Sequence, residues 1–157
     1  LETARRLVGR IHGEVRSLVW DLRDETGTSL SDAIRGAAAT LDGTTAATIS
    51  VSVAGEPWPV PAVPVHNLKR VAQEAITNAL KHAGASAVRV EVRFEPAAVT
   101  VSVSDDGKGF DPAGPAPAGH FGLVGMRERV RKLGGELRVT SEPGAGTTVA
   151  VRVGKPV

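Results

Sequence analysis

The strongest constraint on the fold lies in mid-chain, where residues 70–84 (RVAQEAITNALKHAG) predict one helix with two unlike faces. Apolar residues at steps of three and four share one side of such a helix; they are Leu68, Ala72, Ala75, Ile76, Ala79 and Ala83. Glu74, Asn78 and Lys81 form a polar stripe roughly opposite. An acid, an amide and a cation in line suit a metal ion and a polyphosphate. They also suit a solvated helix face, and these three residues alone do not decide between the two.

Other segments around this helix carry the signals of strands and of two further helices. We expect strands over residues 48–53, 87–94, 98–104, 137–140 and 147–153, with a hairpin turn over 143–146. A helix over residues 30–41 has a cap in Ser29 or Ser31 and a stop in Asp42-Gly43, and another over 122–133 ends at Gly134-Gly135. Prolines at 57, 59, 61 and 64 exclude regular structure before the central helix. We therefore expect that helix to begin near Val65 or His66 and to be capped by Gly84.

Composition excludes several classes of function. The 157 residues suit one domain with a short appendage, and 41% hydrophobic with 23% charged residues is ordinary for a soluble globular protein. A net charge of +2 and 3% aromatic residues argue against nucleic acid as a partner. The absence of cysteine excludes disulfides and thiol chemistry. The sequence has neither an apolar run long enough to cross a membrane nor a signal peptide. We therefore expect a cytoplasmic domain, whose parent can still be membrane-bound. Because the chain begins at Leu1 and its one methionine is Met126, we expect a longer parent protein.

The first 23 residues repeat apolar side chains at heptad spacing, which predicts a helix of a coiled coil or bundle. A partner helix outside this chain is one interpretation, and a helix that covers its own domain is the other. His12 falls beside the apolar seam, where we expect it to be exposed rather than a phosphoacceptor. We expect residues 1–25 to be this helix and a linker, and residues 26–157 to be one catalytic domain.

Glycine-rich segments follow the central helix in a fixed order. They are DDGKGFD (residues 105–111), PAGPAPAG (112–119), GLVGM (122–126) and GAG (144–146). Glycine lets a backbone approach a ligand, and a glycine pair at a helix N-terminus favours phosphate. Residues 112–119 are either an active-site lid or a passive linker. Each segment alone is weak evidence, but their order after the polar stripe indicates a nucleotide site.

With QEAITNALKHA, DDGKGFD and GLVGMRER, the chain resembles the ATP-binding catalytic domain of sensor histidine kinases, in the NarL-type subfamily of the GHKL ATPases. DNA gyrase B, MutL and the heat-shock chaperone ATPases belong to the same superfamily. The resemblance covers about residues 30–155, and residues 1–23 are similar to the second helix of the subfamily's dimerisation and phosphotransfer domain. It implies an α/β fold: a two-layer sandwich with a mixed sheet covered by helices on one face, known as the Bergerat ATP-binding fold.

The resemblance also implies roles for single residues, with ATP and Mg²⁺ as cofactors. Asn78 would ligate Mg²⁺, an ion that suits oxygen donors, and Glu74 would polarise the nucleophile or orient waters on the metal. Asp105 would accept a hydrogen bond from the amino group of adenine, where guanine offers an acceptor. The remaining candidates would contact the phosphates or approach the base; they are Lys81, His82, Asp106, Gly107, Gly109, Gly122, Val124, Gly125, Thr147 and Thr148.

One departure from the subfamily concerns the phosphoacceptor. The subfamily's phosphoacceptor lies in a histidine-aspartate box on the first helix of the dimerisation domain, and this box is absent. His12 lies on the segment that matches the second helix. We therefore expect ATP binding without efficient autophosphorylation of this chain. The resemblance implies transfer of the γ-phosphoryl group to a histidine on a missing helix, a response regulator as partner, and a homodimer through the N-terminal helix. Two alternatives remain: another GHKL protein, such as an anti-sigma serine kinase or a chaperone-type ATPase, and a module that no longer binds nucleotide.

Overall fold

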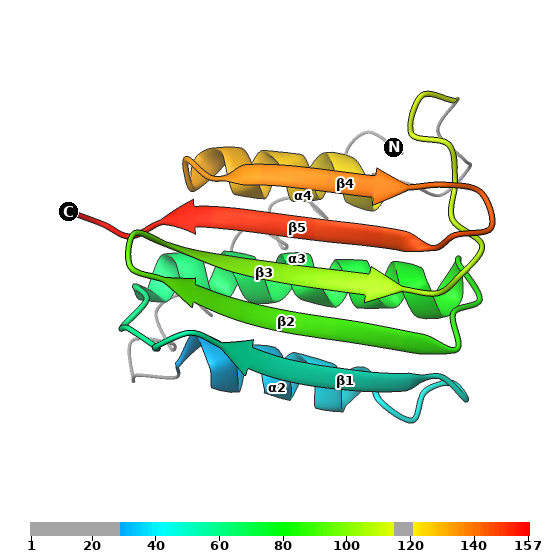
Figure 1. Cartoon of the computed structure of the whole chain (residues 1–157), viewed down its shortest axis with the longest axis horizontal. Helices are drawn as coiled ribbons and strands as arrows, with labels where there is room; N and C mark the ends of the chain where they lie inside the picture. The colour runs from blue at the N-terminus through cyan, green and yellow to red at the C-terminus, as the bar shows by residue number, and fades with distance from the viewer. Residues whose placement is uncertain (1–28, 115–120) are drawn as a thin grey trace, which may run out of the picture.

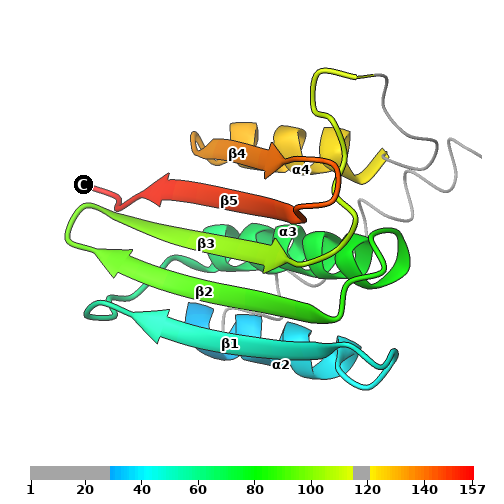
Figure 2. The same ribbon diagram turned by 45° about the vertical axis from the view of Figure 1, so that its right-hand side comes forward.

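Three helices lie behind one five-stranded sheet in the computed structural model, which describes residues 29–114 and 121–157 (Figure 1). The helices are α2 (Leu30–Leu41), α3 (Ala62–Lys81) and α4 (Phe121–Lys132). The strands are β1 (Thr48–Ala54), β2 (Ala87–Glu95), β3 (Ala98–Asp105), β4 (Glu136–Ser141) and β5 (Thr147–Gly154). The turned view in Figure 2 keeps all three helices on one face of the sheet.

The sheet has the order β1-β2-β3-β5-β4. β1 pairs with β2 in parallel, and the other three pairs are antiparallel. The chain crosses from β1 to β2 through α3, as a parallel connection requires. The expected two-layer α/β sandwich, with a mixed sheet covered on one face, is confirmed.

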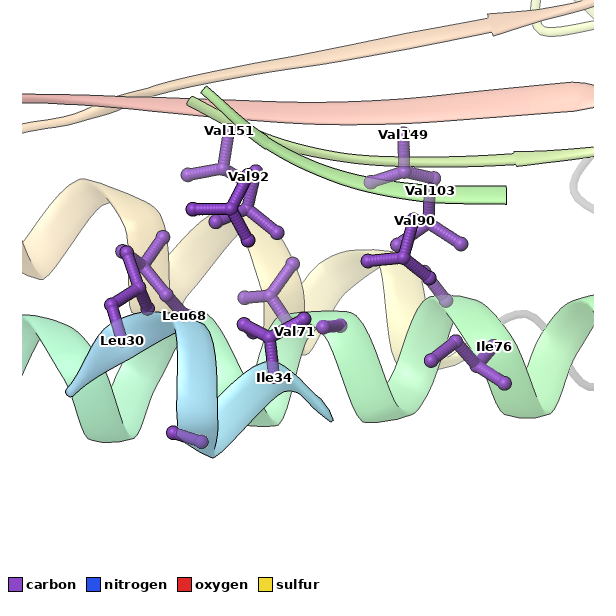
Figure 3. Close-up of a cluster of buried hydrophobic side chains, with 14 of the residues drawn as sticks. Leu30, Ile34, Leu68, Val71, Ile76, Val90, Val92, Val103, Val149 and Val151 are labelled. Atoms are coloured by element: carbon purple, nitrogen blue, oxygen red, sulfur yellow. The ribbon is translucent and has the colours of Figure 1, made fainter. Parts of the chain in front are cut away.

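Alternation along the strands builds the core. In β2, four alternate side chains are buried against the helices and the charged residues between them lie on the open face; the buried ones are Val88, Val90, Val92 and Phe94. Valines of β3 and β5 meet Leu68, Val71 and Ile76 of α3 in the cluster shown in Figure 3. With few aromatic residues, the chain fills this layer with valine, alanine, leucine and isoleucine. The helix α3 is therefore the central support of the sheet.

The sequence predicted the position of most elements. All five expected strands are present, each longer by a residue at one or both ends, and α2 has the expected bounds with Ser29 as its cap. The Ser29 Oγ accepts a hydrogen bond from the Asp32 N–H at 3.1 Å. α4 lies one residue earlier than predicted.

The expected bounds of the central helix were wrong at both ends. α3 begins at Ala62, with Pro61 as its N-cap, so Pro64 lies within the first turn. A proline is tolerated there because the N–H groups of the first turn have no helical partner. At the other end the C-cap is His82 rather than Gly84, which follows with a φ of +61° and turns the chain toward β2.

Two expected features lie outside the described residues: the helix over residues 1–23 and residues 115–119 of the segment 112–119. Within residues 29–114 and 121–157, no helix combines the length and the apolar character that crossing a bilayer requires.

Candidate functional site

A cavity of about 150 Å³ opens where β3 ends and β5 begins, beside the last turns of α3. Five of the predicted site residues line it: Asn78, His82, Asp105, Gly109 and Thr147. The other lining residues are Ala75, Ala83, Val103, Lys108, Phe110, Leu123 and Val149. The cavity therefore has a largely apolar lining of helix and strand side chains with a few polar groups, which is typical of a small-molecule site.

Asp105 is the carboxylate in this cavity. It is the last residue of β3, is half-buried, and its Oδ1 accepts a hydrogen bond from the Gly107 N–H at 2.8 Å. Gly107 has no room for a side chain, because an added Cβ would lie 2.5 Å from the Ala83 Cβ and 2.6 Å from the Ala83 carbonyl oxygen. The tight turn holds one carboxylate oxygen and leaves the acid at the cavity wall as a fixed hydrogen-bond acceptor.

The glycine loop after β3 is fixed from two sides. The Lys108 N–H donates to the Ala83 carbonyl at 2.9 Å, which ties the loop to the end of α3. The Gly144 N–H donates to the Lys108 carbonyl at 2.6 Å, which ties it to the β4–β5 turn. Gly109 takes a φ of +60°, and a Cβ there would collide with the Glu142 carbonyl. The loop is thus a rigid wall of the cavity.

Thr147 lies next to Asp105 on the adjacent strand, since the two are register partners of β5 and β3. Its hydroxyl lies 2.8 Å from the hydroxyl of Ser141, the last residue of β4. Ser141 is buried and also accepts a hydrogen bond from the Phe110 N–H at 2.9 Å. The sequence reasoning missed Ser141, because a single serine at a strand end belongs to no motif.

The polar stripe of α3 does not converge on one site. Asn78 lines the cavity, but Glu74, one turn earlier, lines a second hollow of about 410 Å³ with Gly122 and Gly125. Gly122 packs directly on Glu74, because an added Cβ would lie 2.8 Å from the Glu74 Cδ. Lys81 is exposed and lines neither hollow. The second hollow also contains Arg70, Gln73, Thr77 and Arg129, which the sequence reasoning had not assigned to a site.

Three further predicted residues point away from the cavity. Thr148 lies on the open face of the sheet, where its hydroxyl is 3.0 Å from that of Ser104. Val124 is 59% exposed on α4. The Asp106 carboxylate accepts hydrogen bonds from the N–H groups of Ser86 and Ala87, at 2.8 and 3.0 Å. These bonds, that from Ala87 foremost, hold the pKa of Asp106 below its usual range, so this carboxylate fastens the start of β2.

The described side chains form no group of three or more histidines and acids that could hold a metal alone. Asn78 nevertheless brings an amide oxygen to the cavity wall. Mg²⁺ retains several waters and is commonly held by one or two protein oxygens together with substrate phosphates. The donor set therefore fits a Mg²⁺ ion that arrives with a polyphosphate, and Asn78 is the residue that would hold it.

Comparisons with known proteins agree with this geometry. The family model for "Histidine kinase-, DNA gyrase B-, and HSP90-like ATPase" matches residues 65–156, more than half of the chain. DegS of Brevibacillus brevis, a signal transduction histidine-protein kinase/phosphatase, is 35% identical over 153 residues, 95% of this chain and 39% of that protein. The sensor histidine kinase LnrJ of Bacillus subtilis is 32% identical over 136 residues, 87% of this chain and 33% of that protein. The chain thus spans about two fifths or less of these relatives.

Solved structures give the same result. The histidine kinase domain of a blue-light activated histidine kinase from Erythrobacter litoralis EL346 superposes with a TM-score of 0.60 at 31% identity, over 79% of this chain and 63% of that one. The mycobacterial sensor histidine kinase MprB, at 21% identity, has a TM-score of 0.59 over 83% of this chain and 97% of that one, and supports the fold alone.

The resemblance expected from the sequence is confirmed, with DegS as a relative of the NarL type. The family match includes most of α3, the end of β3, the glycine loop and β5, whose residues line the cavity. The chain therefore belongs to the family of histidine kinase-, DNA gyrase B- and HSP90-like ATPases, as an ATPase domain of the sensor histidine kinase kind.

Proposed function

We propose that this domain binds Mg-ATP in the cavity at the end of β3 and presents its γ-phosphoryl group to a histidine on a helix outside these 157 residues. A response regulator would then take the phosphoryl group, and in the parent protein two copies would associate through the N-terminal helix. The observation that carries the proposal is the half-buried Asp105 carboxylate, fixed by Gly107 at the wall of an otherwise largely apolar cavity.

The cavity supports recognition of adenine. One Asp105 oxygen is engaged by the Gly107 N–H, and among the described residues no donor reaches the other. A carboxylate only accepts hydrogen bonds, so it favours a base that presents an amino group over one that presents a carbonyl. Ala75, Val103 and Val149 supply apolar surface for the ring.

The phosphates would extend from the base along α3, toward Asn78. Bound Mg²⁺ would supply positive charge that neutralises the polyphosphate, and Asn78 would hold it. Glu74, one turn before Asn78, lines the neighbouring hollow, and from there it would polarise the accepting imidazole or orient waters. Phosphoryl transfer demands mainly positioning and charge neutralisation, so these groups suffice for the proposed reaction.

Titration of a fluorescent ATP analogue into the chain, with and without Mg²⁺, tests the proposal. Asp105→Asn puts an amide in place of an acceptor oxygen and should weaken binding roughly 10- to 150-fold, since a hydrogen bond to a charged group contributes about 1.5–3 kcal/mol. The matched control is Asp106→Asn, because that carboxylate binds main-chain N–H groups outside the cavity. Asn78→Ala should remove the gain in affinity that Mg²⁺ confers. Equal affinities for the wild type and Asp105→Asn would contradict the adenine assignment.

The alternative from the same superfamily is a serine kinase of the anti-sigma type. The sensor kinase relatives along most of the chain favour a histidine as acceptor. With the full-length parent and labelled ATP, acid-labile and alkali-stable phosphate supports the histidine, whereas acid-stable phosphate on serine of a partner supports the alternative.

A further inference from the structure

Ser141 joins three segments at or beside the cavity through one buried hydroxyl. The residue is 7% exposed and lies at the end of β4. Its Oγ accepts from the Phe110 N–H at 2.9 Å, donates to the Gly146 carbonyl at 3.1 Å, and lies 2.8 Å from the Thr147 Oγ1. A single side chain therefore holds the loop after β3, the β4–β5 turn and the first residue of β5.

The direction of the bond between the two hydroxyls follows from counting protons. A serine hydroxyl has one proton to donate and two lone pairs to accept with. The Gly146 carbonyl can only accept, so the Ser141 proton belongs to that bond. The Phe110 N–H fills one lone pair. Donation by the Thr147 hydroxyl is then the arrangement in which all three contacts are hydrogen bonds and every hydrogen-bonding site of the buried serine is satisfied.

This direction determines what Thr147 offers to the cavity. Its proton is turned toward Ser141, so only its lone pairs remain for a ligand. Asp105, its register partner on β3, is also an acceptor. Directly opposed side chains on neighbouring strands have Cβ atoms about 4.5–5.5 Å apart. The end of the cavity thus presents two acceptors side by side, which suits an exocyclic amino group with two hydrogens and opposes a carbonyl oxygen at the same place.

We propose that Ser141 is a positioning residue that holds Thr147 as an acceptor and thereby strengthens the selection of an amino-bearing purine. This inference rests on the proposed function, because it assumes that the cavity takes the base of a nucleotide. Ser141 touches no ligand in this role and acts through Thr147.

The test compares ATP with inosine triphosphate, which carries a carbonyl oxygen where adenine has its amino group. The dissociation constants of both nucleotides, with Mg²⁺, are measured by competition against a fluorescent ATP analogue. In Ser141→Ala the Thr147 proton is free to turn into the cavity, so ATP should lose affinity and inosine triphosphate should not. We expect the preference for ATP to fall about fivefold, the value of one ordinary hydrogen bond. Thr147→Val should lower the preference similarly.

Two further variants separate positioning from general support of the fold. Adding Ser141→Ala to Thr147→Val should leave the preference unchanged, because no hydroxyl remains to be oriented. Ser104→Ala is the matched control: it breaks a serine–threonine hydroxyl pair between neighbouring strands on the open face of the sheet, and should leave the preference intact. Should Ser141→Ala not fold, Ser141→Cys tests the same point, since a thiol is a weak donor and acceptor.

The outcomes are distinct. If the wild type binds neither nucleotide, the proposed function fails, and this inference with it. If the wild type prefers ATP and Ser141→Ala retains that preference, the inference alone is overturned. An additive loss in the double variant overturns it as well, because Ser141 would then act independently of Thr147.

Discussion

Two adjacent carboxylates show how one residue step separates binding from support. Asp105 ends β3 with its side chain on the helix-covered face, in the cavity. Asp106 follows and binds the main chain at Ser86 and Ala87. Successive side chains along a strand point to opposite faces, so neighbours of the same type acquire unrelated roles. Substitutions at Asp106 should therefore be read as changes in stability.

The pH dependence of stability gives a direct test of Asp106. Hydrogen bonds from Ala87 and Ser86 lower its pKa in the folded chain, so the ionised form favours folding. Its contribution is complete above the pKa of an unfolded aspartate, about 3.9, and is lost as the pH falls through the lower folded pKa. Urea unfolding at several pH values should show the wild type more stable than Asp106→Asn at pH 7, with the gap narrowing as the pH falls below about 3.9. A gap that stays constant with pH would contradict this role.

At the scale of elements, the β4–β5 turn contains two glycines that are required for different reasons. Gly144 and Gly146 have φ values of +81° and +80°. A Cβ on Gly144 would meet nothing within 4 Å, whereas one on Gly146 would collide with the Asp105 carbonyl. Both positions need left-handed backbone, but only Gly146 also needs space against β3.

Alanine substitutions at Gly144 and Gly146 distinguish the cost of backbone strain from the cost of a steric contact. Gly144→Ala should lower the free energy of unfolding by about 1–2 kcal/mol, the penalty for a left-handed residue with a Cβ. Gly146→Ala should lower it by about 1–3 kcal/mol more, because main-chain atoms must move. Urea denaturation measures both. Since the displaced strand carries Asp105, ATP affinity should fall only in Gly146→Ala. Equal effects of the two variants on stability would argue against the contact.

Local patterns predicted the elements, and their assembly required the structure. Strand-like runs in the sequence located every described strand, with period-two alternation clearest in β1 and β2, and the Asp105 loop could be assigned because its residues are consecutive. The strand order and the parallel pairing of β1 with β2 depend on which helix faces bury which strands, and no single segment records that. The sequence puts Glu74 and Asn78 in one stripe of α3. In the structure, Glu74 lines the second hollow together with Thr40 of α2 and Gly125 of α4, whereas Asn78 lines the cavity. The start of α3 was predicted too late because Pro64 argued against a helix there. A proline disrupts the interior of a helix but is tolerated in its first turn.

Across the whole molecule, the cavity and a tryptophan cluster lie at opposite ends of the sheet. The Trp58 Nε1–H donates to the Glu95 carbonyl at 2.9 Å, and its ring meets that of Phe94 edge-on at 6.0 Å. The Lys155 Nζ lies 5.1 Å from the centre of the indole ring. Glu95 pairs with Ala98, the first residue of β3, and Asp105 is its last. At about 3.3 Å per residue, the two sites are roughly 23 Å apart.

Trp58 should therefore report folding without reporting ligand. In a Trp20→Phe background it is the one remaining indole. Saturating ATP should leave its emission unchanged, while urea should shift the emission to longer wavelength as the ring enters water. Phe110→Trp, made in a chain without both native tryptophans, is the matched control, because residue 110 lines the cavity and its indole should respond to ATP. A response of Trp58 to ATP would mean that the two ends of the sheet are coupled.

The interlocking of the two glycine turns also bears on protein engineering. Gly109 packs on the Glu142 carbonyl, Gly146 packs on the Asp105 carbonyl, and Gly144 donates to Lys108. Each loop therefore depends on the main chain of the other for its packing and for one of its hydrogen bonds. A designer who grafts this pocket onto another scaffold, or recombines it between relatives, must exchange residues 105–111 and 141–147 as one cassette, and a chimera that carries only one of the two inherits a mismatched seam.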